Sequence, residues 1–250
     1  MNALKTNLLV FFRRILAPLK NTILHPQWIS YRGEVLVDWV SSIRGGVVLD
    51  VGCADRWPEK YLSIESQYIG LDYFETATKM YGSQVNVYAN AECLPFRAES
   101  IDVVLLFDVF EHINDDEKAL KELYRVLKIG GSVFMQIPFM YPVHDAPYDF
   151  RRPTKYGIEE LAERNGFFVE CFGSRGKPME TACLLINIAM VKSLLNGMGK
   201  YAPVAVLFLP VVVGLSVLFN CVGWIASTVL SDDEIMPFSY HFILKKKESS

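Results

Sequence analysis

Short apolar runs alternate with amphipathic stretches between residues 47 and 138. Such runs predict strands that are buried on both faces, as in a parallel sheet. The predicted strands are Val47–Val51, Tyr68–Asp72, Gln84–Tyr88, Asp102–Phe107 and Ser132–Pro138. Because strands alternate with helical stretches, the pattern predicts an α/β fold with a mainly parallel sheet.

The pattern also predicts two helices clearly. Asn114–Leu127 places apolar residues on one face; Asn114 is its expected cap, and Gly130-Gly131 ends the unit. A second helix, Thr154–Asn165, starts at a threonine after proline and stops before a glycine. Two further strands of the sheet are expected at Phe167–Phe172 and Ser239–Lys245.

A long uncharged segment lies between these last two strands. Residues 201–231 carry no charged side chain, and a helix needs about 20 apolar residues to cross a hydrocarbon core. Pro210 and Gly214 interrupt the run, which predicts two helical arms that are each too short to span a membrane. The segment is therefore predicted to form a re-entrant or in-plane hairpin, to which the apolar stretch Ala182–Leu195 also contributes. Because both flanking strands join one sheet, the insertion has to return to its own side. Alternatively, this segment forms a dimer interface or a lid over an apolar acceptor pocket.

The N-terminal 20 residues predict a basic amphipathic helix. Arg13 and Arg14 stop the apolar run Leu8–Phe12 before it reaches the length of a secretory signal. Contact with a membrane surface and packing on the protein itself remain equal alternatives.

Composition removes several classes of function. A net charge of −3 provides no basic footprint for nucleic acid. The five cysteines lack any C-x-x-C pair, so we expect reduced thiols and no metal site; they are Cys53, Cys93, Cys171, Cys183 and Cys221.

The first strand ends in a loop suited to a ligand. Gly52 stands where backbone has to approach a ligand at the carboxyl edge of the sheet. Ala54 and Trp57 occupy the remaining glycine positions of a dinucleotide fingerprint, and Asp50 and Asp55 would repel a pyrophosphate. A cationic, phosphate-free cofactor suits this loop better. Asp72, which ends the second strand, can accept both ribose hydroxyl hydrogens or can act as a turn residue.

Six segments in this order resemble class I methyltransferases of the ubiquinone-biosynthesis-like type, which use S-adenosylmethionine. They are 48–53, 68–72, 90–96, 101–104, 110–112 and 125–131. The resemblance implies a Rossmann-like fold with a seven-stranded sheet whose last strand is antiparallel. The uncharged segment adds a hydrophobic helical insertion before that strand. The resemblance also implies a cofactor site made of Asp50, Gly52, Cys53, Ala54, Asp72, Tyr73, Asn90, Ala91, Glu92, Phe107 and Asp108.

The chain departs from that family pattern at two places. Ala54 stands where the family loop has glycine, which is tolerated if its φ is negative. Asn90 replaces an adenine-contacting aspartate and keeps one side-chain oxygen as an acceptor.

The segment after the fifth strand carries the candidate catalytic groups. A hydroxyl acceptor benefits from a general base, for which the candidates are His144, Asp145 and Asp149. The segment also resembles methyltransferases of bacterial surface-polysaccharide clusters. The candidate acceptor-binding residues are His112, Tyr148, Arg151 and Arg152.

Each of these acceptor-binding residues has a structural alternative. Arg151 and Arg152 suit a phosphate or carboxylate, or else a surface ion pair with Glu159, Glu160 or nearby aspartates. His112 is better explained by a hydrogen bond that closes the turn after the fourth strand.

The sequence therefore predicts four regions: an amphipathic N-terminal region over 1–30, a methyltransferase domain over 31–180, a membrane-associated insertion over 181–232, and a last strand and tail over 233–250. We expect an enzyme on the cytoplasmic face of a membrane, such as a bacterial inner membrane, attached through residues 201–230. Its expected acceptor is a small molecule or a lipid-linked or glycan-type compound. A prenyl-quinone methyltransferase and a non-catalytic cofactor-binding scaffold are the alternatives.

Overall fold

The computed structural model describes residues 17–31, 35–81, 85–230 and 234–248 of the 250-residue chain. The predicted N-terminal amphipathic helix lies largely outside these residues. Within them the chain forms two compact units. The sheet unit falls within 34–139, 143–174 and 239–250, and the hairpin unit falls within 1–33, 140–142 and 175–238.

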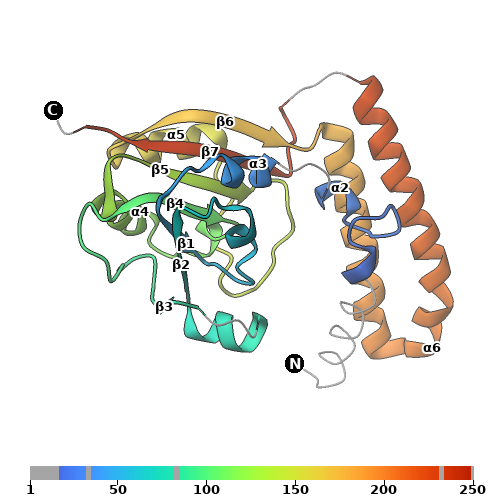
Figure 1. The fold of residues 1–250 in the computed structure, drawn as a ribbon. Coiled ribbons are helices and arrows are strands. Elements are labelled where there is room, and N and C mark those ends of the chain that lie inside the picture. Colours follow the sequence, from blue (N-terminus) through green and yellow to red (C-terminus); the bar gives the residue numbers. More distant parts are fainter. Residues whose placement is uncertain (1–16, 32–34, 82–84, 231–233, 249–250) are drawn as a thin grey trace. The chain divides into compact units, whose positions relative to one another are not determined.

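A seven-stranded sheet with the order β3-β2-β1-β4-β5-β7-β6 organises the sheet unit (Figure 1). The parallel strands are β1 (Gly46–Val51), β2 (Ser66–Asp72), β3 (Val87–Tyr88), β4 (Ile101–Phe107) and β5 (Leu127–Pro138). β7 (Ser239–Lys246) runs antiparallel to β5 and separates it from β6 (Phe167–Arg175). This arrangement confirms the predicted fold class.

Helices cover both faces of this sheet, as the continuous apolar runs require. On one face, α4 (Asp116–Val126) and α5 (Lys155–Arg164) pack Leu120 and Leu161 against buried strand residues such as Leu49. On the other face, Val40 of α3 (Val35–Ser42) packs against Val48, Leu105 and Phe134. The shorter turns are η2 (Trp57–Tyr61), the π-helical η3 (Thr76–Tyr81) and η4 (Phe110–His112).

Most predicted elements are confirmed to within a few residues. Two details differ: the residue that caps α4 and the position of Gly130-Gly131. The cap of α4 is Asp115 rather than Asn114, since its side chain accepts a hydrogen bond from Lys118 N at 3.0 Å. Gly130-Gly131 lies inside β5 rather than at the end of a unit, and Gly130 has a φ of 73°. Gln84, the first residue of a predicted strand, lies outside the described residues.

The hairpin unit contains η1 (Ala17–Leu19), α2 (Trp28–Tyr31) and α6 (Pro178–Val229), and α6 doubles back on itself (Figure 1). Lys177 Nζ donates to Ser227 O at 2.8 Å, and Asn187 Nδ2 donates to Asn220 Oδ1 at 3.0 Å. The two arms are therefore antiparallel. Phe238 N donates to Arg175 O at 2.8 Å, so the two ends of the insertion are joined by a hydrogen bond.

The predicted interruption at Pro210 and Gly214 is wrong, because the helix continues through both residues. The two apolar arms are Pro178–Gly197 with 20 residues and Leu207–Val229 with 23 residues. Each arm is thus long enough by length and composition to cross a bilayer, a property that buried helices of soluble proteins also have.

Candidate functional site

The carboxyl ends of three neighbouring parallel strands, β1, β2 and β4, form the candidate site. Ligands bind at this edge in open α/β sheets. Asp50, near the end of β1, is buried and accepts a hydrogen bond from Tyr68 Oη at 2.6 Å. Burial raises the pKa of Asp50 to about 7, although the Tyr68 bond lowers it, and the charges of Asp72 and Asp55 raise it further.

The loop after β1 is held close to its neighbours at Gly52. This residue has a φ of 71°, and its N donates to Leu71 O at 2.8 Å. A Cβ at Gly52 would lie 2.3 Å from Val109 Cγ2, so a side chain is excluded. The next residue, Cys53, is buried, and burial first and then the charge of Asp50 raise its pKa to about 12. Its thiol is therefore protonated and not a nucleophile.

The condition for tolerating alanine at position 54, a negative φ, is not met. Ala54 has a φ of 45° and Arg56 has a φ of 59°, both in the left-handed region that favours glycine. Two contacts hold the strained loop. Arg56 N donates to Cys53 O at 2.7 Å, and the Trp57 ring stacks on Phe107, at the end of β4, with a centroid distance of 5.7 Å.

The carboxylate of Asp72 connects the loop after β1 with the loop after β2 through hydrogen bonds. Its carboxylate accepts hydrogen bonds from Ala54 N at 3.0 Å and from Tyr73 N at 2.7 Å. Burial raises the pKa of Asp72, and these two amides lower it in part. Each carboxylate oxygen retains a further lone pair for a ligand hydroxyl. The Tyr73 side chain is exposed beside it.

The segment from Asn90 to Glu92 is a turn held by its own side chains. Asn90 Oδ1 accepts from Glu92 N at 2.8 Å, and Glu92 Oε1 accepts from Asp115 N at 3.2 Å. Ala91 is buried between them. Asn90 thus has a structural role that the family resemblance did not imply, and its oxygen keeps one lone pair for a ligand.

Asp108 follows Phe107 and is also strained, with a φ of 55°. Its Oδ2 accepts from Gln136 Nε2 at 2.8 Å, and its N donates to Gln136 O at 3.0 Å. These two bonds to β5 fix the direction in which the chain leaves β4 toward η4.

A second cluster lies just beyond Asp108. Glu111 is fully buried, with 0% of its surface exposed, and neither of its carboxylate oxygens has a hydrogen-bond partner among the described residues. Glu111 Oε1 lies 3.8 Å from His112 Nε2 and 3.6 Å from His144 Nε2. His112 Nδ1 lies 2.8 Å from Tyr148 O. The contact with Glu111 raises the pKa of His144, even though burial lowers it.

Asp149 supports the other side of His144. His144 Nδ1 lies 3.3 Å from Asp149 Oδ2, and His144 N donates to the same oxygen at 2.9 Å. Arg152 Nη2 donates to Asp149 Oδ2 at 2.6 Å. Burial raises the pKa of Asp149, but the bonds from Arg152 and His144 N outweigh it and hold that pKa below its ordinary value.

The remaining predicted residues of this segment lie around the cluster. Arg151 pairs with Asp116 of α4 and donates to Asn114 O at 2.7 Å. Both arginines therefore have carboxylate partners within the chain, although Asp116 was not one of those named from the sequence. Asp145 is exposed with a φ of 48°, and the exposed Tyr148 contributes its backbone carbonyl.

Glu111 is the functional candidate that reasoning from the sequence missed. In the sequence, Glu111 stands out only as part of the family motif Phe110-Glu111-His112. A carboxylate next to a histidine after an apolar strand is the available signal, but burial of the carboxylate depends on contacts from β5 and the segment after it.

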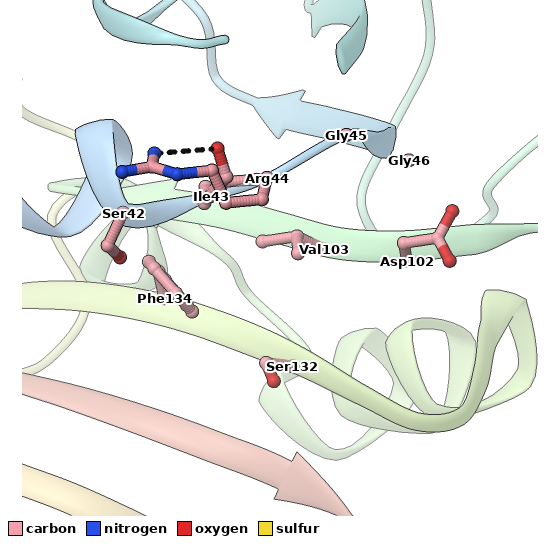
Figure 2. Close-up of a pocket in the computed structure, with 9 residues that line it drawn as sticks. All are labelled: Ser42, Ile43, Arg44, Gly45, Gly46, Asp102, Val103, Ser132 and Phe134. Atoms are coloured by element: carbon pink, nitrogen blue, oxygen red, sulfur yellow. Dashed lines mark hydrogen bonds between the residues drawn. The ribbon is translucent and has the colours of Figure 1, made fainter. Parts of the chain in front are cut away.

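A separate pocket lies at the amino edge of the sheet (Figure 2). Arg44, Gly46 and Asp102 line it, near the starts of β1 and β4. Ligands of open α/β sheets bind at the opposite edge, so this pocket is not the candidate site.

Part of the chain is similar to known methyltransferases. Residues 49–135 match the family described as "Methyltransferase domain". A probable S-adenosylmethionine-dependent methyltransferase of Mycolicibacterium smegmatis is 31% identical over 137 residues, which is 50% of this chain and 53% of that protein. A ubiquinone/menaquinone biosynthesis C-methyltransferase of Klebsiella pneumoniae is 36% identical over 90 residues, which is 34% of this chain and 35% of that protein. The chain thus spans about half or less of the curated relatives it matches.

Solved structures agree on the fold. A putative methyltransferase of Bacillus halodurans has a TM-score of 0.52 at 16% identity, covering 86% of this chain and 98% of that one. A phosphoethanolamine N-methyltransferase of Haemonchus contortus, solved with S-adenosyl-L-methionine, has a TM-score of 0.51 at 17% identity, covering 95% of this chain and 60% of that one.

Proposed function

We propose that this chain, in which residues 49–135 form a class I S-adenosylmethionine-dependent methyltransferase domain, methylates an oxygen of a lipid-linked or glycan-type acceptor at a membrane surface. The proposal has three parts: the methyl donor, the acceptor atom and the attachment to a membrane. Each part is supported by a different group of residues.

The buried carboxylate of Asp50 is the observation that supports the methyl donor. A buried carboxylate with a raised pKa gains most from a cationic ligand, and S-adenosylmethionine carries a sulfonium and an ammonium group. Asp50 and Ala54 would lie by the methionine part, while Asp72 would accept the ribose hydroxyls. Because Gly52 has no side chain, the loop after β1 packs closely against Val109, which holds this loop at the edge where such a ligand would bind.

The donor supplies an activated methyl group with a good leaving group. The protein therefore contributes chiefly by positioning the acceptor. An acceptor hydroxyl also has to lose its proton, and His144 with Asp149 is a histidine–carboxylate pair suited to receive it. This pair favours an oxygen acceptor. A prenyl quinone, methylated on carbon, is the second candidate, because the Klebsiella relative bears that activity in its name.

The hairpin unit supports attachment to a membrane because its polarity is inverted. Large apolar side chains of the second arm are exposed, including Leu207 at 75% and Leu218 at 53%. Polar side chains of the two arms, namely Asn187, Ser216 and Asn220, are buried. Polar groups inside and apolar groups outside are typical of helices in lipid. Since both ends of the insertion meet at Arg175 and Phe238, two crossings or a re-entrant hairpin would return the chain to the side of the sheet unit.

The methyl-transfer part is tested with purified full-length protein, labelled S-adenosylmethionine and a membrane-lipid extract. We expect label in an extracted lipid or glycolipid, and no transfer by Asp72→Ala. Glu170→Gln, an exposed substitution on β6, is the matched control and should retain transfer. Binding of S-adenosylmethionine by calorimetry without transfer to any acceptor would favour a non-catalytic cofactor-binding scaffold, and absence of binding would contradict the proposed methyl donor. Label found only in added prenyl quinone would favour the second candidate.

Membrane attachment is tested by flotation of the protein with vesicles of anionic and zwitterionic phospholipids. We expect the wild-type chain to float and Leu218→Glu to float less. Ile129→Glu, which places the same charge at an exposed apolar position of β5 in the sheet unit, is the matched control. If the two variants float equally, the hairpin is not the attachment site.

A further inference from the structure

We propose that Glu111, His112 and His144 bind one divalent transition-metal ion. The role that we give this ion, binding and activating the acceptor hydroxyl, rests on the proposed function, whereas the binding site itself rests on the geometry of these three residues. The sequence predicted no metal, so the proposal departs from that expectation.

The first observation is a carboxylate that is buried without hydrogen-bond partners in the described part of the chain. Glu111 has 0% exposure, and both of its oxygens lack such a partner. A buried ionised carboxylate without compensation costs several kcal/mol, so a nearby positive charge is expected. The groups that approach Glu111 Oε1 are the two imidazole nitrogens, at 3.6 and 3.8 Å. These distances are too long for hydrogen bonds.

The same distances suit shared ligands of one ion. Ligand atoms of the three residues all lie within 4.8 Å of one another. Two atoms held about 2.1 Å from a zinc ion at a tetrahedral angle are about 3.4 Å apart. The two distances from Glu111 Oε1 need to shorten by a few tenths of an ångström. The two imidazole nitrogens, which lie within 4.8 Å of each other, need to approach by at most about 1.4 Å to surround an ion together with Glu111. Two histidines and one carboxylate leave a further coordination position for a substrate oxygen.

The second observation concerns the far side of each imidazole ring. His112 Nδ1 lies 2.8 Å from Tyr148 O, and a carbonyl oxygen requires this nitrogen to carry the proton. His144 Nδ1 lies 3.3 Å from Asp149 Oδ2 and 3.2 Å from Arg152 Nη2. Arg152 can only donate a hydrogen bond, so His144 Nδ1 either accepts from Arg152 or carries a proton that it donates to Asp149. Metal binding requires the second tautomer, which leaves the lone pair of Nε2 for the ion. Metal-binding histidines are oriented in this way, by a carboxylate or a carbonyl on the opposite nitrogen.

The cluster lies next to the candidate methyl-donor site. Val109, two residues before Glu111, is the side chain that would clash with a Cβ at Gly52. A metal ion here would lower the pKa of a bound acceptor hydroxyl. Because His144 bound to the ion has no free nitrogen, it would no longer act as the general base. The hydroxyl proton would pass to solvent instead, the oxygen would form a bond to the methyl carbon, and the carbon–sulfur bond would break with its electron pair remaining on sulfur. The substrate class that fits is an acceptor whose hydroxyl oxygen can bind a metal.

The test uses the purified full-length chain, stripped of metals with a chelator, and titration calorimetry with Zn²⁺ and Mn²⁺ at mildly alkaline pH. We expect one equivalent of Zn²⁺ to bind, and Glu111→Gln and His144→Gln to weaken this affinity at least a hundredfold. His25→Gln, which alters a histidine of the hairpin unit, is the matched control and should bind as wild type does. Absorption spectra with Co²⁺ provide a second readout, since imidazole and carboxylate ligation alters its visible bands.

Binding of S-adenosylmethionine, measured on the same samples, separates this inference from the proposed function and shows that the variants are folded. If wild-type protein binds S-adenosylmethionine but no metal ion, or if Glu111→Gln and wild type bind Zn²⁺ equally, the metal site is overturned. Zinc binding that is lost in both cluster variants supports the site, even if no acceptor is methylated.

Discussion

Replacing Asp50 with asparagine should stabilise the ligand-free protein at alkaline pH while weakening its binding of S-adenosylmethionine. Burial raises the pKa of Asp50 from its ordinary value of 3.8 to about 7. Between these two pH values the native state binds a proton that the unfolded state has released, so stability falls as the pH rises. Above about pH 7 the ionised carboxylate therefore destabilises the fold by an amount that no longer grows.

The size of this effect follows from the two pKa values. Their difference corresponds to about 4 kcal/mol in total, of which about 2 kcal/mol develops between about pH 5 and pH 7. An asparagine side chain at this position would carry no charge and could still accept the hydrogen bond from Tyr68. We therefore expect the melting temperature of Asp50→Asn to exceed that of wild type by roughly 5–10 °C more at about pH 8 than at about pH 5.

Thermal unfolding in a mild detergent, monitored by intrinsic fluorescence, measures this difference. Asp102→Asn is the matched control with the opposite sign. Burial raises the pKa of Asp102, but Lys128 and Val47 N outweigh it and lower that pKa, so the ionised form stabilises the fold at neutral and alkaline pH. A gain for Asp50→Asn that is the same at both pH values would refute the reasoning.

The same substitution should also change the affinity for the ligand. Losing a charge-assisted contact should weaken S-adenosylmethionine binding by Asp50→Asn roughly tenfold to a hundredfold. A variant that is more stable but binds less well would show that Asp50 is retained for the ligand rather than for the fold.

Three further substitutions test other contacts. Gly52→Ala should lower the free energy of unfolding by roughly 1–3 kcal/mol and weaken cofactor binding, since its Cβ would lie 2.3 Å from Val109 Cγ2; denaturant titration and calorimetry measure the two effects. Asn220→Leu should cost roughly 2–4 kcal/mol in thermal unfolding, because Ile23 O, His25 O and Asn187 Nδ2 lose a partner. Arg125→Met should cost roughly 1–2 kcal/mol and weaken cofactor binding measured by calorimetry, because it frees the carbonyls of Leu94 and Phe96.

The sheet and its binding edge could be predicted because they depend on local patterns. An apolar run such as Asp102–Phe107 predicts a buried strand, and Gly52 or Asp72 at a strand end predicts a position at the carboxyl edge. The structure has these residues at that edge.

Features that depend on contacts distant in sequence could not be predicted in this way. Nothing local in the sequence reveals that Glu111 is buried beside His144, because the two are brought together by the pairing of β4 with β5. Pro210 predicts a break in an isolated helix, yet the helix continues through this residue. The fold class was thus more predictable than the exact site.

Backbone strain in the sheet unit gathers where function is proposed. Five residues other than glycine have a positive φ among the described residues, and four of them, Ala54, Arg56, Asp108 and Asp145, lie in loops that follow β1, β4 and β5. Each such residue costs on the order of 1 kcal/mol or more and persists only where neighbouring contacts hold it. These strained loops lie at the carboxyl edge of the sheet, between Asp50 and His144. The fold is therefore less stable along the same edge that would bind the methyl donor and the metal ion. Strain there and an unfavourable charge at Asp50 are two forms of one property, a site that is complete only with its ligands bound.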